Sequence, residues 1–124
     1  MTKGKVVLVP CPFDDLSATK VRPAVCLTDP IGAHRHVVLA FISSQIPGVP
    51  LPTDLVLRSG DPDFSATGLR GNSVLRLHRM MTVSTALIQR ELGTLSAALQ
   101  AAVEHRLVSL FQLPIAPDDP AVKP

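Results

Sequence analysis

Short apolar runs, each closed by proline or by a polar cluster, occupy most of this 124-residue chain. The clearest runs cover residues 6–9, 24–27 and 37–42, and residues 54–57 and 73–78 add two shorter stretches in which side chains alternate between two faces. Runs of this length, rich in Val, Leu and Ile and bounded by turn residues, are typical of buried strands and too short for ordinary helices. Residues 80–83 and 88–92 are candidates for two more, so the sequence predicts five to seven short strands.

A helical period occurs in one place, near the C-terminus. Ser96 is a suitable N-cap for a helix. Apolar residues then recur at spacings of four, four and three, which places them on one helical face: Leu99, Val103, Leu107 and Leu110. We expect this helix to cover the open side of a β core, although an apolar surface for a partner has the same pattern. The predicted fold class is therefore mainly β with one C-terminal helix, a small and strongly curved barrel or half-barrel.

The length fits a single domain, which we place at residues 1–113, followed by a flexible tail at 114–124. Residues 58–71 are rich in Gly, Asp, Ser and Pro, and we expect an exposed, mobile connection there. Apolar residues make up 46% of the chain, which excludes a disordered protein. The N-terminus has no apolar signal segment and no run is long enough to span a membrane, so we expect a cytoplasmic protein.

Charge and composition restrict the function classes further. A formal net charge of +2 permits a nucleic-acid partner without requiring one. Trp and Tyr are absent and Phe numbers four, which argues against a broad base-stacking platform. Two cysteines are too few for a disulfide framework or a four-cysteine zinc site, and we expect reduced thiols.

Arg22 is the first candidate functional residue, because it precedes Pro23 at the entrance of a predicted strand. Proline favours an extended conformation for the preceding residue, and Pro23 itself belongs at a strand's start or edge. We likewise expect Pro10 and Pro12 to end the first strand. An arginine mounted in this way is suited to grip a phosphate. The alternative is a surface arginine paired with an aspartate, the nearby ones being Asp14, Asp15 and Asp29.

Ser43, Ser44 and Gln45 end the apolar run at 37–42 with an abrupt change to hydrogen-bonding side chains. Two buried strands that both end in polar groups could bring those groups to one site. The alternative is ordinary capping of the strand backbone by the serine hydroxyls.

The histidines could in principle supply acid–base or metal chemistry. His34 and His36 alternate at a strand entrance, where they could contact phosphate, bind a metal or be solvated. Without a third ligand, such a pair is weak support for zinc. His78 and His105 are expected to be structural, and Asp14 and Asp15 are candidate general bases or simple turn formers.

Four blocks in order resemble the PemK/MazF family of toxin–antitoxin ribonucleases. They read GKVVLVPCPFDDL at 4–16, VRPAV at 21–25, VVLAFISSQ at 37–45, and GNSVLR at 71–76 running on to LGTL at 92–95. Together they cover about residues 4–112.

This resemblance implies an SH3-like barrel of the PemK/MazF/CcdB type that forms a homodimer. It also implies cleavage of single-stranded RNA without a metal or other cofactor, giving a 2′,3′-cyclic phosphate and a 5′-hydroxyl. A cognate antitoxin would lie across the RNA groove. The family's catalytic positions correspond to Arg22 and Ser43. Its RNA-binding positions correspond to the loop after the first strand and the end of the third: Asp14, Thr19, Lys20, Ser44 and Gln45.

Two other functions remain open from the sequence. One is a non-catalytic barrel that binds a protein target such as a topoisomerase, as gyrase-poisoning relatives of the fold do. The other is a metal enzyme that uses His34 and His36.

Overall fold

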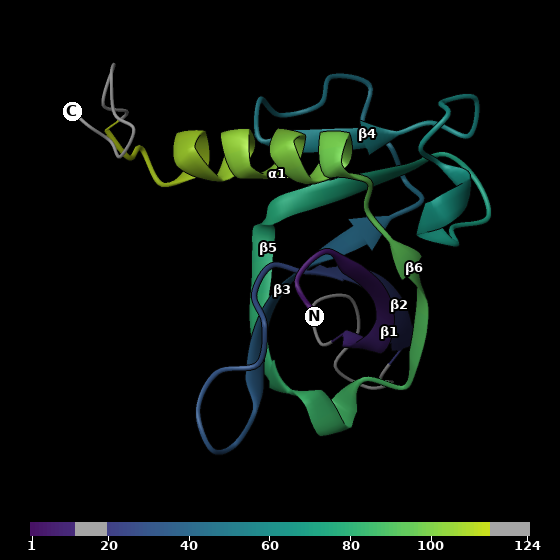
Figure 1. The fold of residues 1–124 in the computed structure, drawn as a ribbon. Coiled ribbons are helices and arrows are strands. Elements are labelled where there is room, and N and C mark those ends of the chain that lie inside the picture. Colours follow the sequence, from purple (N-terminus) through teal and green to yellow (C-terminus); the bar gives the residue numbers. More distant parts are fainter. Residues whose placement is uncertain (12–19, 115–124) are drawn as a thin grey trace.

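The computed structural model describes residues 1–11 and 20–114, which form one curled antiparallel sheet with a helix packed on it (Figure 1). The strand order is β4-β5-β3-β2-β1-β6. The elements are β1 (Lys5–Cys11), β2 (Lys20–Cys26), β3 (His36–Ser43), β4 (Asp54–Leu57), η1 (Ser65–Thr67), β5 (Ser73–Ser84), η2 (Thr85–Leu87), β6 (Arg90–Thr94) and α1 (Ala97–Leu110). The sheet curls into a half-barrel, so the predicted fold class is confirmed.

Both faces of the sheet carry apolar side chains. Successive side chains of a strand point to opposite faces, and each face packs into its own apolar cluster. In β1, Val6 belongs to the apolar cluster under α1, whereas Val7 and Val9 belong to a second cluster. Met81 and Ile88 pack against the second cluster from β5 and from the chain after η2. This double coverage explains why the strands read as continuous apolar runs.

Helix α1 begins where the sequence predicts, because the Ser96 hydroxyl accepts a hydrogen bond from the Leu99 N–H at 3.1 Å. Val103 is fully buried, and Leu99, Leu107 and Leu110 pack partly buried against the same cluster. The helix lies over β4 and β5 (Figure 1). The expectation of a helix that covers the β core is confirmed.

Prolines inside the β1–β2 ladder contradict one expectation. β1 continues through Pro10 to Cys11, and Pro23 lies in the middle of β2 opposite Leu8. The Leu8 carbonyl accepts a hydrogen bond from Gln89 at 2.9 Å, so the Leu8 backbone faces away from Pro23. Pro10 follows Leu8 by two residues, and the registered pairing of β1 with β6 ends at Leu8. The ladder therefore has no need of an N–H at either proline.

β5 is one continuous strand where the sequence indicates two, at 73–78 and 80–83. Its pairing with β3 jumps from Ala40↔Met80 to Ile42↔Leu75, so residues 76–79 of β5 lie opposite Phe41 alone. The apparent break at residue 79 is thus an irregularity within a single strand. β6 also begins at Arg90, two residues later than expected, because the N–H of Ile88 bonds to the Thr85 carbonyl at 3.1 Å and so closes the preceding 3-10 turn.

Residues 58–71 are not exposed throughout, which corrects a second expectation. Phe64 and Thr67 are buried, and Phe64 belongs to the cluster under α1. Gly68 has φ +74°, and a Cβ there would collide with the Leu92 carbonyl oxygen of β6. A Cβ at Gly93 would collide in turn with the Ala66 carbonyl oxygen. Backbone therefore packs directly on backbone between η1 and β6, which requires glycine at both positions.

The end of the chain stays partly a prediction. The described chain leaves α1 at Leu110 and is exposed through Pro114. The predicted tail from residue 115 and the loop at 12–19 lie outside the described residues, so the domain division remains an expectation. Within the described ranges, no helix is long and apolar enough to cross a membrane.

Candidate functional site

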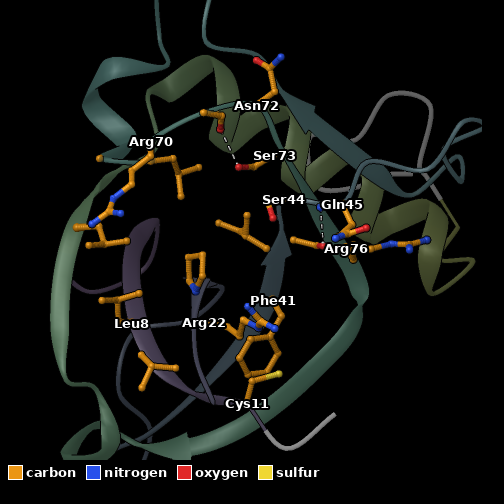
Figure 2. A pocket seen from close by; sticks show the side chains of 18 of the residues that line it. Leu8, Cys11, Arg22, Phe41, Ser44, Gln45, Arg70, Asn72, Ser73 and Arg76 are labelled. Atoms are coloured by element: carbon orange, nitrogen blue, oxygen red, sulfur yellow. Dashed lines mark hydrogen bonds between the residues drawn. The ribbon is translucent and has the colours of Figure 1, made fainter. Parts of the chain in front are cut away.

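A hollow of about 840 Å³ opens where β1, β2 and β3 approach the segment 68–73 (Figure 2). Its lining includes residues from β5 and β6 as well, so it collects side chains from most of the sheet. Arg22 and Ser43 both belong to this lining. The structure therefore brings the two predicted catalytic residues to one place.

Arg22 is the third residue of β2 and lies opposite Val9 of β1. Alternation along the strand places Arg22 on the same face as Ala24 and Cys26, which are fully buried in the second apolar cluster. The arginine itself is partly buried and reaches the hollow. It lies two residues inside the strand, not at its entrance, because the ladder with β1 already begins at Lys20.

Asp29, one alternative partner for Arg22, has another role. Its Oδ1 accepts hydrogen bonds from the N–H groups of Thr2 and Lys3 at 2.7 and 2.9 Å. These two bonds, the one from Lys3 first, lower the pKa of the Asp29 carboxyl. Asp29 therefore fixes the N-terminal segment, which lies beside the Cys26 end of β2.

Ser43 ends β3, and its Oγ accepts a hydrogen bond from the Gln45 N–H at 3.0 Å. The hydroxyl thus orders the turn that follows, as the capping alternative predicts. Its own O–H can still donate, since a serine hydroxyl is a donor as well as an acceptor. Ser44 and Gln45 are exposed and also line the hollow, so three polar side chains from this strand end meet there.

The remaining predicted RNA-binding residues are not part of this arrangement. Asp14 and Thr19 lie outside the described residues. Lys20 is exposed at the start of β2, opposite Cys11, and is not among the lining residues. The structure thus brings together Arg22 and the three residues 43–45 of the predicted set.

Five arginines line the hollow, and no carboxylate does so among the residues that the structure describes. They come from β2, the segment 68–73, β5 and β6: Arg22, Arg70, Arg76, Arg79 and Arg90. The formal net charge of +2 does not reveal this concentration, because it sums over the whole sequence and says nothing of where the charges gather. Oriented guanidinium groups with few nearby carboxylates create a field that attracts anions.

Sequence reasoning did not identify the arginines of β5 and β6. Arg76 and Arg79 both lie in the irregular stretch of β5 opposite Phe41, which carries them to the hollow. Two cations that interrupt an apolar strand pattern were an available signal of a polar site. Arg90 had no such signal, because its position depends on where β6 begins.

Arg76 is held from behind by Asp54, whose side chain is completely buried. Asp54 accepts hydrogen bonds from Arg76 Nε at 3.2 Å and Nη2 at 3.3 Å, and from the Leu51 N–H at 2.8 Å. Its backbone carbonyl accepts one more from Arg106 Nε of α1 at 2.9 Å. The charge of Arg76 is therefore compensated within the protein, and the strand pair is joined to the helix.

The histidines lie away from this hollow. His34 is exposed in the β2–β3 connection and His36 is exposed at the start of β3, and their stacked rings have centroids 5.9 Å apart. His78 and His105 are also exposed. No three His, Cys, Asp or Glu side chains within the described ranges are grouped so that they could hold a metal ion. Burial raises the pKa of the Cys26 thiol to about 11, so this thiol is not a nucleophile at neutral pH.

The geometry is that of an anion-binding site with hydroxyl and amide donors at one side. Guanidinium groups donate to phosphate oxygens in parallel pairs and keep their charge at any ordinary pH. No general base is present among the described lining residues, which include neither a carboxylate nor a histidine.

Solved structures with the same fold include several bacterial toxins. The Mycobacterium tuberculosis toxin MazF-mt6 is 22% identical with a TM-score of 0.66, over 89% of this chain and 98% of that one. A mycobacterial endoribonuclease solved with its cognate antitoxin is 16% identical with a TM-score of 0.65, over 92% and 97%. The MazE–MazF complex of Deinococcus radiodurans is 18% identical with a TM-score of 0.61, over 92% and 97%.

These identities are low, so the likeness establishes the fold alone. No curated protein matches the sequence. A family model does match, over residues 2–111, and its description is the PemK-like, MazF-like toxin of type II toxin–antitoxin systems. The match spans nearly the whole chain and includes every strand of the sheet and the helix α1. The chain therefore belongs to the PemK-like, MazF-like family of type II toxin–antitoxin toxins.

Proposed function

We propose that this protein is an endoribonuclease toxin that cleaves single-stranded RNA without a metal ion. The observation that supports this most strongly is the shared location of Arg22 and Ser43 in a hollow lined by five arginines. Membership of the toxin family supports the same reaction, and one mycobacterial protein of the same fold is an endoribonuclease.

In the proposed reaction the 2′-hydroxyl of RNA attacks the adjacent phosphorus. A bond forms between O2′ and phosphorus while the bond to O5′ breaks, so the products are a 2′,3′-cyclic phosphate and a 5′-hydroxyl. The 2′ proton leaves to a base, and the departing 5′ oxygen gains a proton. Negative charge grows on the non-bridging oxygens, where the Arg22 guanidinium can donate two hydrogen bonds.

Ser43 has a supporting role in this scheme. A serine hydroxyl is too weakly basic to accept the 2′ proton by itself. Its Oγ accepts a hydrogen bond from the Gln45 N–H, which leaves the O–H hydrogen available. That O–H can donate to a phosphate oxygen or orient the 2′-hydroxyl. The general base is unassigned, and Asp14 and Asp15 remain candidates outside the described residues.

The direct test is incubation of purified protein with single-stranded RNA in the presence of EDTA. We expect cleavage by the wild type, with cyclic phosphate ends. Arg22→Ala should cleave on the order of a hundredfold more slowly or worse, because one well-placed transition-state donor is lost. Arg58→Ala is the matched control, since Arg58 is exposed and outside the lining. No cleavage by the wild type, or undiminished cleavage by Arg22→Ala, would refute the proposal.

A cognate antitoxin and a second copy of the chain are the proposed partners. An acidic antitoxin segment would complement the arginines of the hollow and compete with RNA. Exposed apolar side chains at Val49, Phe111 and Leu113 offer surface for self-association. Sedimentation should give a homodimer at micromolar concentration, and a monomer of 13.2 kDa would contradict this part of the proposal.

The non-catalytic alternative predicts a different outcome of the same experiments. RNA would remain intact, and a topoisomerase subunit would co-purify with the protein. The concentration of arginines around the hollow favours the RNA substrate, because phosphates of a nucleic-acid strand are the anions that such a surface attracts.

A further inference from the structure

The segment 68–73 forms one rim of the hollow and is fixed at both ends. Thr67 Oγ1 donates to the Phe64 carbonyl at 2.6 Å and accepts from the Leu69 N–H at 3.2 Å. On the other side, Ser73 Oγ donates to the Gly71 carbonyl at 2.8 Å. Asn72 Oδ1 accepts from the Ser59 N–H at 2.7 Å. Together with the close packing of Gly68 and Gly93 described above, these bonds hold the rim against β6.

Arg70 is mounted on this rim and lines the hollow while remaining exposed. Figure 2 shows it on the side of the hollow across from Ser44 and Gln45. Within the described ranges, no hydrogen bond or ion pair joins its guanidinium to another residue. Arg70 therefore differs from Arg76, whose charge Asp54 compensates.

We propose that Arg70 is a substrate-positioning residue that binds a backbone phosphate of the RNA strand, away from the bond that Arg22 acts on. The inference rests on the proposed RNA-cleaving function. It places one end of the path that the RNA strand takes through the hollow at Arg70. A fixed backbone beneath a long cationic side chain presents the charge without first having to order a loop. A strand that enters at Arg70 would cross the hollow toward residues 43–45.

The test measures binding separately from cleavage. The probe is a fluorescein-labelled RNA oligonucleotide of mixed sequence with every 2′-hydroxyl methylated, so that it cannot be cut. Anisotropy titrations across a range of salt concentrations give the affinity and its salt dependence. Arg70→Gln should bind about fivefold more weakly at 0.1 M salt, and its log–log salt slope should be shallower by about 0.7.

Two variants control for charge and for fold. Arg58→Gln removes the same charge from the same connection but outside the lining, and it should match the wild type. Arg70→Lys keeps the charge and should restore the slope. With ordinary RNA, Arg70→Gln should keep the wild-type kcat while its KM rises about fivefold. The reason is that the lost contact binds the substrate and the transition state equally.

The inference would be overturned if Arg70→Gln and Arg58→Gln bound the methylated RNA with equal affinity. It would also be overturned if Arg70→Gln bound more weakly but kept the wild-type salt slope. If the wild type binds the methylated RNA but leaves ordinary RNA intact, the proposed cleavage is refuted. The inference about Arg70 would then still be decided by the salt slopes of Arg70→Gln and the wild type. Wild-type protein that binds no RNA would overturn both.

Discussion

The buried ion pair between Asp54 and Arg76 predicts an unequal response to mutation of its two members. Asp54 has a side chain that is 0% exposed, whereas that of Arg76 is 24% exposed. Arg76→Gln removes the guanidinium from a buried carboxylate whose other hydrogen-bond donor, among the described residues, is the Leu51 N–H, and this should cost about 4 kcal/mol. Asp54→Asn leaves a guanidinium that water can reach, and an amide that still accepts from Leu51, so the cost should be about 1.5 kcal/mol.

The double variant gives the sharpest test of this reasoning. Asp54→Asn combined with Arg76→Gln leaves no unpaired buried charge, and we expect a total cost of about 2 kcal/mol. The two single effects then sum to about 3.5 kcal/mol more than the double effect, which is the coupling between the residues.

The assay is urea unfolding followed by far-UV circular dichroism, because the chain has no Trp or Tyr for fluorescence. A loss of 4 kcal/mol should lower the midpoint by about 2 M urea. All variants are compared at one protein concentration, since self-association would shift the midpoint. Equal costs for the two single variants, or additive costs in the double variant, would refute the argument.

Two further predictions concern stability. Gly93→Ala should lower the free energy of unfolding by about 3 kcal/mol and Tm by about 10 °C, because its Cβ would collide with the Ala66 carbonyl. The control is Gly60→Ala, whose Cβ would meet nothing within 4 Å. Equal Tm values for the two variants would contradict the packing of Gly93 on η1. Asp29 has a folded pKa below its ordinary value of 3.8, so its contribution is present above that value and is lost as pH falls through the folded pKa. Asp29→Asn should remove this part of the acid dependence in unfolding curves measured from pH 5 to pH 2, and an unchanged pH profile would count against it.

Local sequence features predicted the elements well where each element depends on its own residues. The cap at Ser96 and the spacing of Val103 and its neighbours set the start and buried face of α1. The apolar runs indicated β1 to β4, although the ladder extended past Pro10. That error arose because the cost of a proline in a strand depends on which neighbour its missing N–H would face.

The candidate site was likewise predictable only where it depends on neighbouring residues of the chain. The polar ends of two strands pointed to Arg22 and Ser43, and the tertiary structure places both in one hollow. The arrival of Arg76, Arg79 and Arg90 there could not be read from the chain, since it follows from the irregular pairing of β5 and the register of β6.

The sequence by itself determined a small β-rich domain with one covering helix, because alternation and helical period are properties of neighbouring residues. Only the tertiary structure decided that five arginines share a hollow, that Asp54 neutralises one of them, and that the rim bearing Arg70 is fixed to β6. Those outcomes depend on contacts between residues far apart in the chain, where charges and backbone groups meet only after the sheet has curled.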